Sequence, residues 1–232
     1  MFADASVVTF DADETLWAFE IAMRHALAQT IELLRTTHPE VASRWSVDEL
    51  IAVRDRIADE QGRAVTIAEV RRLSFVEALR AQGIDDEELV AALTERYFQH
   101  RHGEVQLFDD VAPMIAALRP DLRLGLVTNG NTDPERSGLP GHFAFVLQAD
   151  AVGVAKPDPH MFELAIAAAG CAPGAIVHVG DSLTHDVAPA AAMGLRTVWI
   201  NRDGRPRPAG VPPPDATITS LLELPALLTR PD

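Results

Sequence analysis

Short apolar runs alternate with helical patterns along most of this sequence. Runs with the length and composition of strands occur at Val7–Phe10, Leu122–Thr128, Ala144–Leu147, Ile176–Val179 and Arg196–Ile200. Helical patterns are predicted near 111–118, 159–169 and 186–193 and from 221 onwards. Strand–helix alternation predicts a mainly parallel sheet with helices on both faces, because parallel strands need crossover connections that are usually helical. We therefore expect an α/β, doubly wound, Rossmann-like fold.

The segment from 17 to 103 has helical periodicity and no convincing strand. Capping boxes, in which a capping residue stands three positions before a Glu, are predicted at 46–49, 66–69 and 85–88. Glycines that should end helices occur at Gly62, Gly83 and Gly103. With a first helix over about 18–36, these signals predict four helices. We expect residues 17–103 to form an all-helical cap domain inserted into a core of residues 1–16 and 104–232.

Composition restricts the function classes. The chain has 232 residues, is 47% hydrophobic and carries 34 acidic against 20 basic residues, a formal net charge of −14. This charge opposes non-specific binding to nucleic acids or anionic membranes, so neither is an expected partner. The single cysteine, Cys171, excludes an internal disulfide and a thiolate metal cluster. No secretory signal or membrane span is apparent, which predicts a cytoplasmic location.

Acidic side chains follow two of the predicted strands. Asp11 and Asp13 come directly after Val7–Phe10, and Asp181 and Asp186 follow the run that ends at Val179. In an open parallel sheet the carboxyl ends of the strands are where ligands bind. An Asp after a strand can also be a simple turn former or a helix N-cap, and Asp186 fits an N-cap as well as a site residue.

Two further segments could complete a site for an anion. Thr128, Asn129 and Gly130 end the run that begins at Leu122, and their hydroxyl and backbone amides could bind a phosphate. Lys156 stands before a proline that precedes a predicted helix. A cation here would reduce the repulsion between acidic side chains and an anionic substrate.

The ordered set D-x-D-x-T, T-N-G, K-P and G-D-x-x-x-x-D resembles the four motifs of the haloacid dehalogenase superfamily. The resemblance covers nearly the whole chain. The sequence around Asp11, residues Phe10–Trp17, is similar to that of the phosphatase branch with a helical cap. One departure is Glu14, where relatives often have Gly or Asp. The resemblance implies a hydrolase that uses Mg²⁺ and acts on a small phosphate monoester.

The resemblance also implies roles for individual residues. Asp11 would be the nucleophile that forms an aspartyl-phosphate, and Asp13 would be the general acid and base. Thr128 and Lys156 would complete the catalytic set, and the same two residues with Asn129 and Gly130 would bind the substrate. The metal group would be Asp11, Asp13 through its main-chain carbonyl, Asp181, and Asp186 behind them.

Three other functions are compatible with parts of this pattern. A 2-haloacid dehalogenase shares the motifs, but halide leaves without a proton and such enzymes typically lack an acid at the position of Asp13. A phospho-receiver domain uses similar residues but is about half as long. A regulatory protein could have kept the fold and lost turnover. The sequence leaves the substrate and the oligomeric state open, monomer or homodimer.

Side chains of the predicted cap that could face a substrate are aromatic, cationic or flexible and apolar. They are Trp17, Phe19, Met23, Arg24, Trp45, Arg71, Arg72 and Phe75. Most residues of this kind in a helical bundle belong to its core or its solvated face.

Overall fold

The computed structural model describes residues 1–61, 65–103 and 105–229. Two compact units make up the chain, one of Met1–Ala18 with Leu107–Asp232 and the other of Phe19–Gln106. We call them the core unit and the helical unit. The predicted helix end at Gly62 lies outside the described residues.

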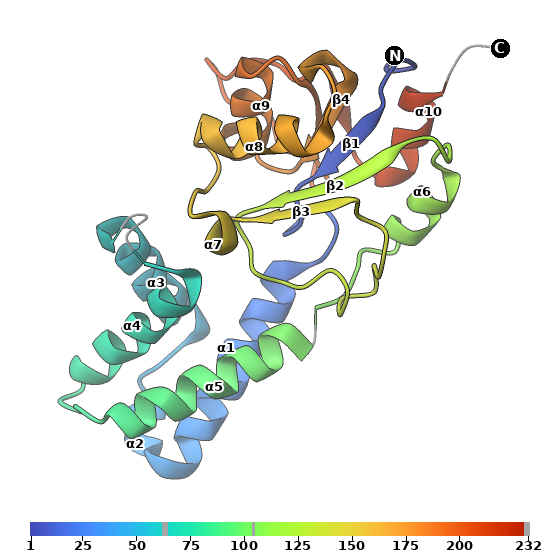
Figure 1. Ribbon diagram of the computed structural model, residues 1–232. Coiled ribbons are helices and arrows are strands. Elements are labelled where there is room, and N and C mark those ends of the chain that lie inside the picture. Colours follow the sequence, from blue (N-terminus) through green and yellow to red (C-terminus); the bar gives the residue numbers. More distant parts are fainter. Residues whose placement is uncertain (62–64, 104, 230–232) are drawn as a thin grey trace. The chain divides into compact units, whose positions relative to one another are not determined.

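A six-stranded sheet forms the centre of the core unit (Figure 1). Its strands are β1 (Val7–Phe10), β2 (Arg123–Thr128), β3 (Phe145–Gln148), β4 (Ile176–Gly180), β5 (Arg196–Ile200) and β6 (Ala216–Ile218). Their order is β3-β2-β1-β4-β5-β6, and every neighbouring pair is parallel. The predicted α/β doubly wound fold is confirmed, and β6 is a strand that the sequence pattern did not predict.

The central strands are buried on both faces. All four residues of β1 and all five of β4 are buried, which explains why these strands are apolar runs without polar alternation. The two polar exceptions satisfy each other, because the Thr9 hydroxyl and His178 Nδ1 are 2.9 Å apart.

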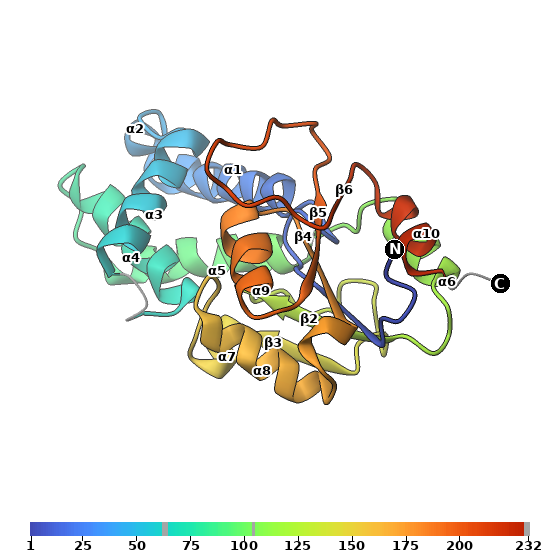
Figure 2. The ribbon, with the colours of Figure 1, turned by 90° about the horizontal axis from the view of Figure 1, so that it is seen from above.

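Helices cover both faces of the sheet. Figures 1 and 2 show α8 (Pro159–Ala169) and α9 (Ala188–Ala192) on one face and α6 (Val111–Ala117) and α10 (Leu224–Leu228) on the other. The short helix α7 (Ala149–Val152) follows β3. Short helical turns lie at Pro173–Ala175, Leu183–Val187 and Leu221–Glu223.

The connection between β2 and β3, residues 129–144, contains no helix. The Phe145 ring instead packs directly on the sheet at Gly125. A Cβ atom at Gly125 would lie 2.3 Å from this ring, so only glycine allows the contact.

The helix predicted over 186–193 begins earlier in the structure. A π-helical turn at Leu183–Val187 precedes α9, and the Ser182 side chain caps it by accepting a hydrogen bond from the His185 amide. Asp186 therefore lies inside a helical turn, and its predicted alternative role as an N-cap is wrong. Its carboxylate is used elsewhere.

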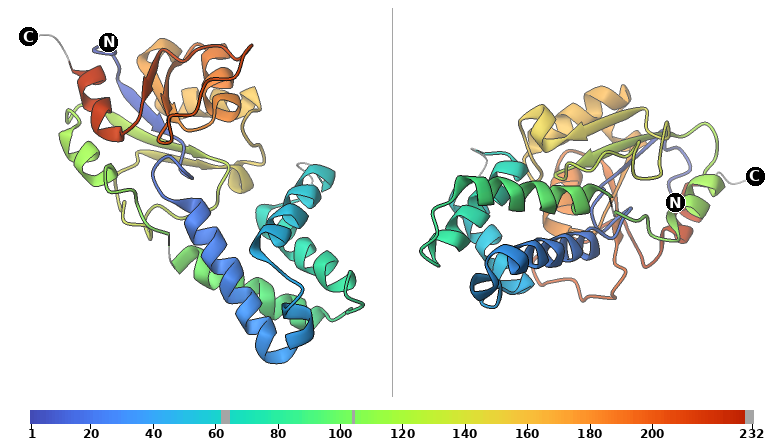
Figure 3. Two further views of the ribbon diagram at one scale, coloured as in Figure 1. Left: turned by 180° about the vertical axis from the view of Figure 1, so that it is seen from behind. Right: turned by 90° about the horizontal axis from the view of Figure 1, so that it is seen from below.

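The helical unit contains one short helix more than predicted. Its helices are α1 (Phe19–Thr37), α2 (Pro39–Ala42), α3 (Val47–Gln61), α4 (Ile67–Arg80) and α5 (Glu87–Gly103). Figure 3 shows α1 and α5 running side by side. The side chains that form the centre of this bundle include Leu27, Leu34, Phe75, Leu79 and Leu93. None of the helices in the described ranges is long and apolar enough to cross a membrane.

The predicted helix caps are partly correct. Ser46 and Glu49 form a reciprocal capping box. Thr66 accepts from the Glu69 amide, but the Glu69 carboxylate pairs with Arg72 rather than with the cap. At α5 the side chain that accepts from the Leu89 amide belongs to Asp86, one residue later than predicted.

Asp110 joins three segments of the core unit. Its carboxylate accepts from Arg202 at 2.7 and 3.0 Å, from the Ser220 hydroxyl at 2.8 Å and from the Leu221 amide at 2.9 Å. Arg202 also donates to the Thr15 carbonyl at 2.8 Å. Burial opposes ionisation of Asp110, but these donors outweigh it and hold its pKa below the usual range.

Asp110→Ala is expected to destabilise the protein by about 2–4 kcal/mol, because it leaves Arg202 partly buried without its partner. Urea unfolding measures the loss. Asp4→Ala removes an exposed carboxylate paired with Arg196 and is expected to cost much less. Because the pKa of Asp110 is lowered on folding, the difference between wild type and Asp110→Ala should shrink as pH falls below about 4. Equal losses in the two variants would contradict this account.

Candidate active site at the carboxyl ends of the central strands

The predicted site residues meet where the sheet reverses its strand order. In the order β3-β2-β1-β4-β5-β6 the chain winds outwards in both directions from β1 and β4, and such switch points are where α/β sheets bind ligands. Asp11 follows β1, Thr128 ends β2, and Asp181 follows β4. Phe10 is in register with both Leu126 and Val179, so the three strands end at the same edge.

Lys156 binds two carboxylates from different elements. Its ammonium Nζ lies 2.5 Å from an oxygen of Asp11 and 2.5 Å from an oxygen of Asp186. All three side chains are almost completely buried. Lys156 is the only lysine in the sequence. Its location between two acids distinguishes it from a solvated surface lysine.

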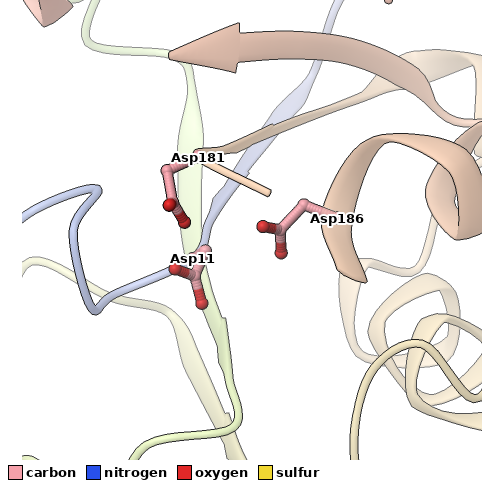
Figure 4. A group of neighbouring side chains, drawn as sticks. All are labelled: Asp11, Asp181 and Asp186. Atoms are coloured by element: carbon pink, nitrogen blue, oxygen red, sulfur yellow. The ribbon is translucent and has the colours of Figure 1, made fainter. Parts of the chain in front are cut away.

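The cluster contains more negative than positive charge. Asp11, Asp181 and Asp186 point toward one another (Figure 4), and one ligand oxygen of each lies within 4.8 Å of the others. Three ionised carboxylates and one lysine give a formal charge of −2, from −3 and +1.

The three acids differ in the direction of their pKa shifts. Burial raises the pKa of Asp181 to about 7, and the nearby charge of Asp186 adds to that rise. Burial also raises the pKa of Asp11, although Lys156 opposes the effect. Burial acts on Asp186 in the same direction, but Lys156 and His178 outweigh it and hold the Asp186 pKa well below its usual range. Burial lowers the pKa of Lys156, but Asp11 and Asp186 outweigh this effect and raise it, so the lysine stays protonated.

Asp186 is held by protein donors on both of its oxygens. One oxygen accepts from Lys156 and lies 3.3 Å from His178 Nε2, and the other accepts from the Ser182 amide at 3.0 Å. The carboxylate packs against Gly180, where a Cβ atom would come within 2.4 Å of it. These contacts favour Asp186 as the residue that orients Lys156 over a role as a direct metal ligand.

His178 is a satisfied histidine that also contacts the site. Burial lowers the pKa of His178, which favours the neutral ring, although the nearby Asp186 opposes this shift. With the proton on Nε2 it donates to Asp186, while Nδ1 accepts from Thr9. The contact with Asp186 connects this core histidine to the site.

The Thr128–Gly130 segment shapes the site in a way the sequence did not predict. The Asn129 side chain forms two hydrogen bonds with the backbone of Lys156, to its carbonyl at 2.8 Å and from its amide at 2.7 Å. The Gly130 amide donates to the Thr128 hydroxyl at 2.9 Å, so in this structure that predicted anion donor is used within its own turn. Asn129 therefore positions the lysine.

Asp13 lies in the loop after Asp11 and accepts a hydrogen bond from the Trp17 indole at 2.7 Å. Thr15 approaches Asp11 from the same loop, with its hydroxyl 3.4 Å from a carboxylate oxygen. Sequence reasoning identified Asp11 and Asp13 but assigned Trp17 to the cap; the structure includes it in the core unit.

The other cap candidates have mostly structural partners. Met23 and Phe75 are in the buried cluster of the helical unit, and Phe19 and Trp45 pack against it. Arg24 and Arg72 form surface ion pairs, with Glu20 and Asp48 and with Glu69 and Glu87. Arg71 is buried with its guanidinium 4.4 Å from the centre of the Tyr97 ring.

The residues present fit a divalent cation. The carboxylates of Asp11 and Asp181 supply hard oxygen ligands of the kind Mg²⁺ prefers, with Asp186 behind them. The formal charge of −2 on the three acids and Lys156 balances the charge of the ion. The raised pKa values of Asp11 and Asp181 indicate acids that a nearby cation would keep ionised.

Comparison with known proteins agrees with this geometry. A family model described as haloacid dehalogenase-like hydrolase matches residues 5–194. The chain belongs to the haloacid dehalogenase-like hydrolases. The family resemblance drawn from the four motifs is thereby confirmed, and the protein is an enzyme of the hydrolase class.

Individual relatives are named phosphatases or dehalogenases. Mouse N-acylneuraminate-9-phosphatase is 30% identical over 97% of this chain and 94% of its own length. Phosphoserine phosphatase from Thermus thermophilus is 38% identical, over 59% of this chain and 56% of its own. The crystal structure of 2-haloacid dehalogenase from Pseudomonas syringae pv. Tomato DC3000 is similar with a TM-score of 0.81 and 36% identity, covering 97% of this chain and 98% of that one.

Lys156→Met is expected to destabilise the fold by about 3–5 kcal/mol, because it leaves two buried carboxylates facing each other without a cation. Adding Asp11→Asn should restore part of the loss, since one of the two repelling charges is then gone. Urea unfolding in the presence of a chelator measures both variants. A double variant no more stable than Lys156→Met would contradict the proposed role of Lys156 as the shared counterion.

Proposed function

We propose that this hydrolase is a Mg²⁺-dependent phosphatase of small phosphate monoesters. The observation that carries the proposal is the pairing of two acids in one loop with different environments. Asp11 is buried against Lys156, whereas Asp13 accepts a hydrogen bond from an indole. One carboxylate can attack while the other transfers protons, which is the division of labour that phosphate ester hydrolysis needs.

The reaction proceeds in two steps on this chain's own residues. An oxygen of Asp11 attacks phosphorus, and the bond to the leaving alkoxide breaks as Asp13 gives that alkoxide a proton. The product is an acyl phosphate on Asp11. A water molecule, deprotonated by Asp13, then attacks the same phosphorus, so Asp11 and inorganic phosphate are released.

Lys156, Asn129 and Thr128 support both steps. The lysine charge offsets the repulsion between the Asp11 carboxylate and an anionic ester. Asn129 fixes the backbone of Lys156, and the Thr128 hydroxyl lies at the end of β2 beside the proposed phosphate site. We assign Gly130 to the same substrate-binding segment.

Asp11, Asp181 and the main-chain carbonyl of Asp13 would hold Mg²⁺, with Asp186 supporting them. When bound, the ion supplies positive charge that stabilises the negative oxygens of the transferring phosphoryl group. We assign catalysis to the core unit and substrate selection to the helical unit acting as a cap. The phosphatase names of two relatives support the ester class.

A second candidate is hydrolysis of 2-haloacids. The structural relative at 36% identity is named a 2-haloacid dehalogenase. Asp13 favours the phosphatase, because an alkoxide leaving group needs a proton and halide does not. A third possibility from the sequence, a regulatory protein without turnover, would bind phosphate but release none.

Wild-type protein is expected to hydrolyse p-nitrophenyl phosphate over many turnovers with Mg²⁺ and to lose this activity with a chelator. Asp11→Asn should lower kcat by at least about 1,000-fold, because the amide cannot form the acyl phosphate. Glu20→Gln, a neutralised surface acid in the helical unit, is the control and should retain wild-type kcat.

Chloride release from 2-chloropropionate, assayed in parallel, separates the candidates. Activity there with none on the phosphate ester would favour the dehalogenase. Turnover of the phosphate ester that survives Asp11→Asn would rule out the proposed nucleophile.

A further inference from the structure

Trp17 makes a direct contact with the proposed general acid. Its indole Nε1 donates to one carboxylate oxygen of Asp13 at 2.7 Å, and Trp17 itself is fully buried. A buried tryptophan whose N–H meets a partner is a rigid donor, since packing fixes the ring. We propose that Trp17 is a positioning residue that orients Asp13 for proton transfer. This inference rests on the proposed function.

The loop between residues 12 and 17 is folded so that Trp17 returns to Asp13. The Ala12 carbonyl accepts from the amides of Leu16 and Trp17, and the Glu14 amide donates to the Trp17 carbonyl at 2.9 Å. Glu14 adopts a left-handed conformation with φ of +60°, which a non-glycine residue takes only at a cost. These three backbone hydrogen bonds hold the strained turn in one conformation.

The far end of the loop is fixed as well. Trp17 pairs with Leu107 in an isolated antiparallel bridge, and the Phe108 amide donates to the Leu16 carbonyl at 3.0 Å. These contacts hold the backbone of Trp17 independently of Asp13. The indole therefore acts on the carboxylate from a fixed position.

Gly130 limits the carboxylate from another side. A Cβ atom at this glycine would lie 2.6 Å from the second oxygen of Asp13 and 3.1 Å from its carboxyl carbon. The missing side chain thus leaves room for Asp13 in the orientation that Trp17 selects. Trp17 and Gly130 belong to different segments, and together they restrict the orientation of the Asp13 side chain.

The chemistry of the indole suits this task. Its N–H is a donor only and does not exchange a proton with a carboxylate under these conditions. A Ser, Tyr or His at the same place could share the proton that Asp13 must move. Trp17 thus fixes the direction of one oxygen without competing for the proton that passes between Asp13 and the leaving group.

The test uses two esters of similar shape that differ in their need for a proton. Phenolate is a stronger base than p-nitrophenolate, so phenyl phosphate depends more on a general acid than p-nitrophenyl phosphate does. Trp17→Phe removes the N–H and keeps an aromatic ring. We expect kcat/KM to fall by about tenfold or more for phenyl phosphate and by less than about threefold for p-nitrophenyl phosphate.

Two further variants exclude a general structural effect. Trp45→Phe makes the same substitution in the helical unit and should leave the ratio of the two activities as in wild type. Gly130→Ala displaces Asp13 from its other side, so the ratio of kcat/KM for phenyl phosphate to that for p-nitrophenyl phosphate should fall, whereas a loss of phosphate binding alone would lower both activities equally. Thermal unfolding checks that each variant is folded at the assay temperature.

A double-mutant cycle tests whether Trp17 acts through Asp13. In an Asp13→Asn background, adding Trp17→Phe should change kcat/KM for phenyl phosphate by less than about twofold, because the proton donor is already absent. Equal losses on both esters, or the full effect of Trp17→Phe without Asp13, would overturn the inference while leaving the phosphatase intact. A wild type inactive on both esters would overturn the proposed function and the inference together.

Discussion

The site depends on one buried ammonium that two acids from distant segments share. Asp11 comes from the end of β1 and Asp186 from the helical turn before α9, and Lys156 brings their oxygens within 2.5 Å of a single nitrogen. Like charges this close and this deeply buried would repel strongly without a cation between them. The position of Lys156 must therefore be fixed, and Asn129 does this through the lysine backbone. Asn129, which follows β2, thus fixes the position of the counterion of Asp11, which follows β1.

The same cluster explains why two equivalent carboxylates can do different work. Asp11 faces Lys156, which supplies a counterion to its carboxylate. Asp13 is only two residues away, but a strained turn at Glu14 brings the indole of Trp17 to it in place of Lys156. The indole is a neutral donor that orients the Asp13 carboxylate, whereas Lys156 places a positive charge beside Asp11. The backbone of one short loop therefore gives the proposed nucleophile and the proposed general acid different partners.

The sequence was sufficient for the parts of this arrangement that follow from periodicity and strand order. Apolar runs predicted the parallel sheet, and the acids after two of these runs predicted which strand ends meet. Contacts set by side-chain direction were not predictable. Trp17 follows the D-x-D motif and looked like the first residue of the cap, and nothing in its spacing shows that the chain turns back at Glu14. The hydrogen bonds of the Asn129 side chain were not predictable, because their partner, the backbone of Lys156, is 27 residues away. The start of the turn at Leu183 was missed because Ser182 and Asp186 are both good N-caps, and only tertiary contacts decide between them.

The choice of lysine at position 156 is itself informative. Of the 20 basic residues, one is lysine and 19 are arginine. Arginine forms surface pairs with Glu and Asp in both units, where its planar fork suits carboxylates in water. Between Asp11 and Asp186 the requirement differs, since two carboxylate oxygens approach one point from two directions. An ammonium is a compact point charge with three donors, and it can serve both acids without separating them. A guanidinium spreads its donors over a plane, whereas here two carboxylate oxygens meet at one nitrogen. The one lysine of the chain stands where its geometry, and not only its charge, is needed.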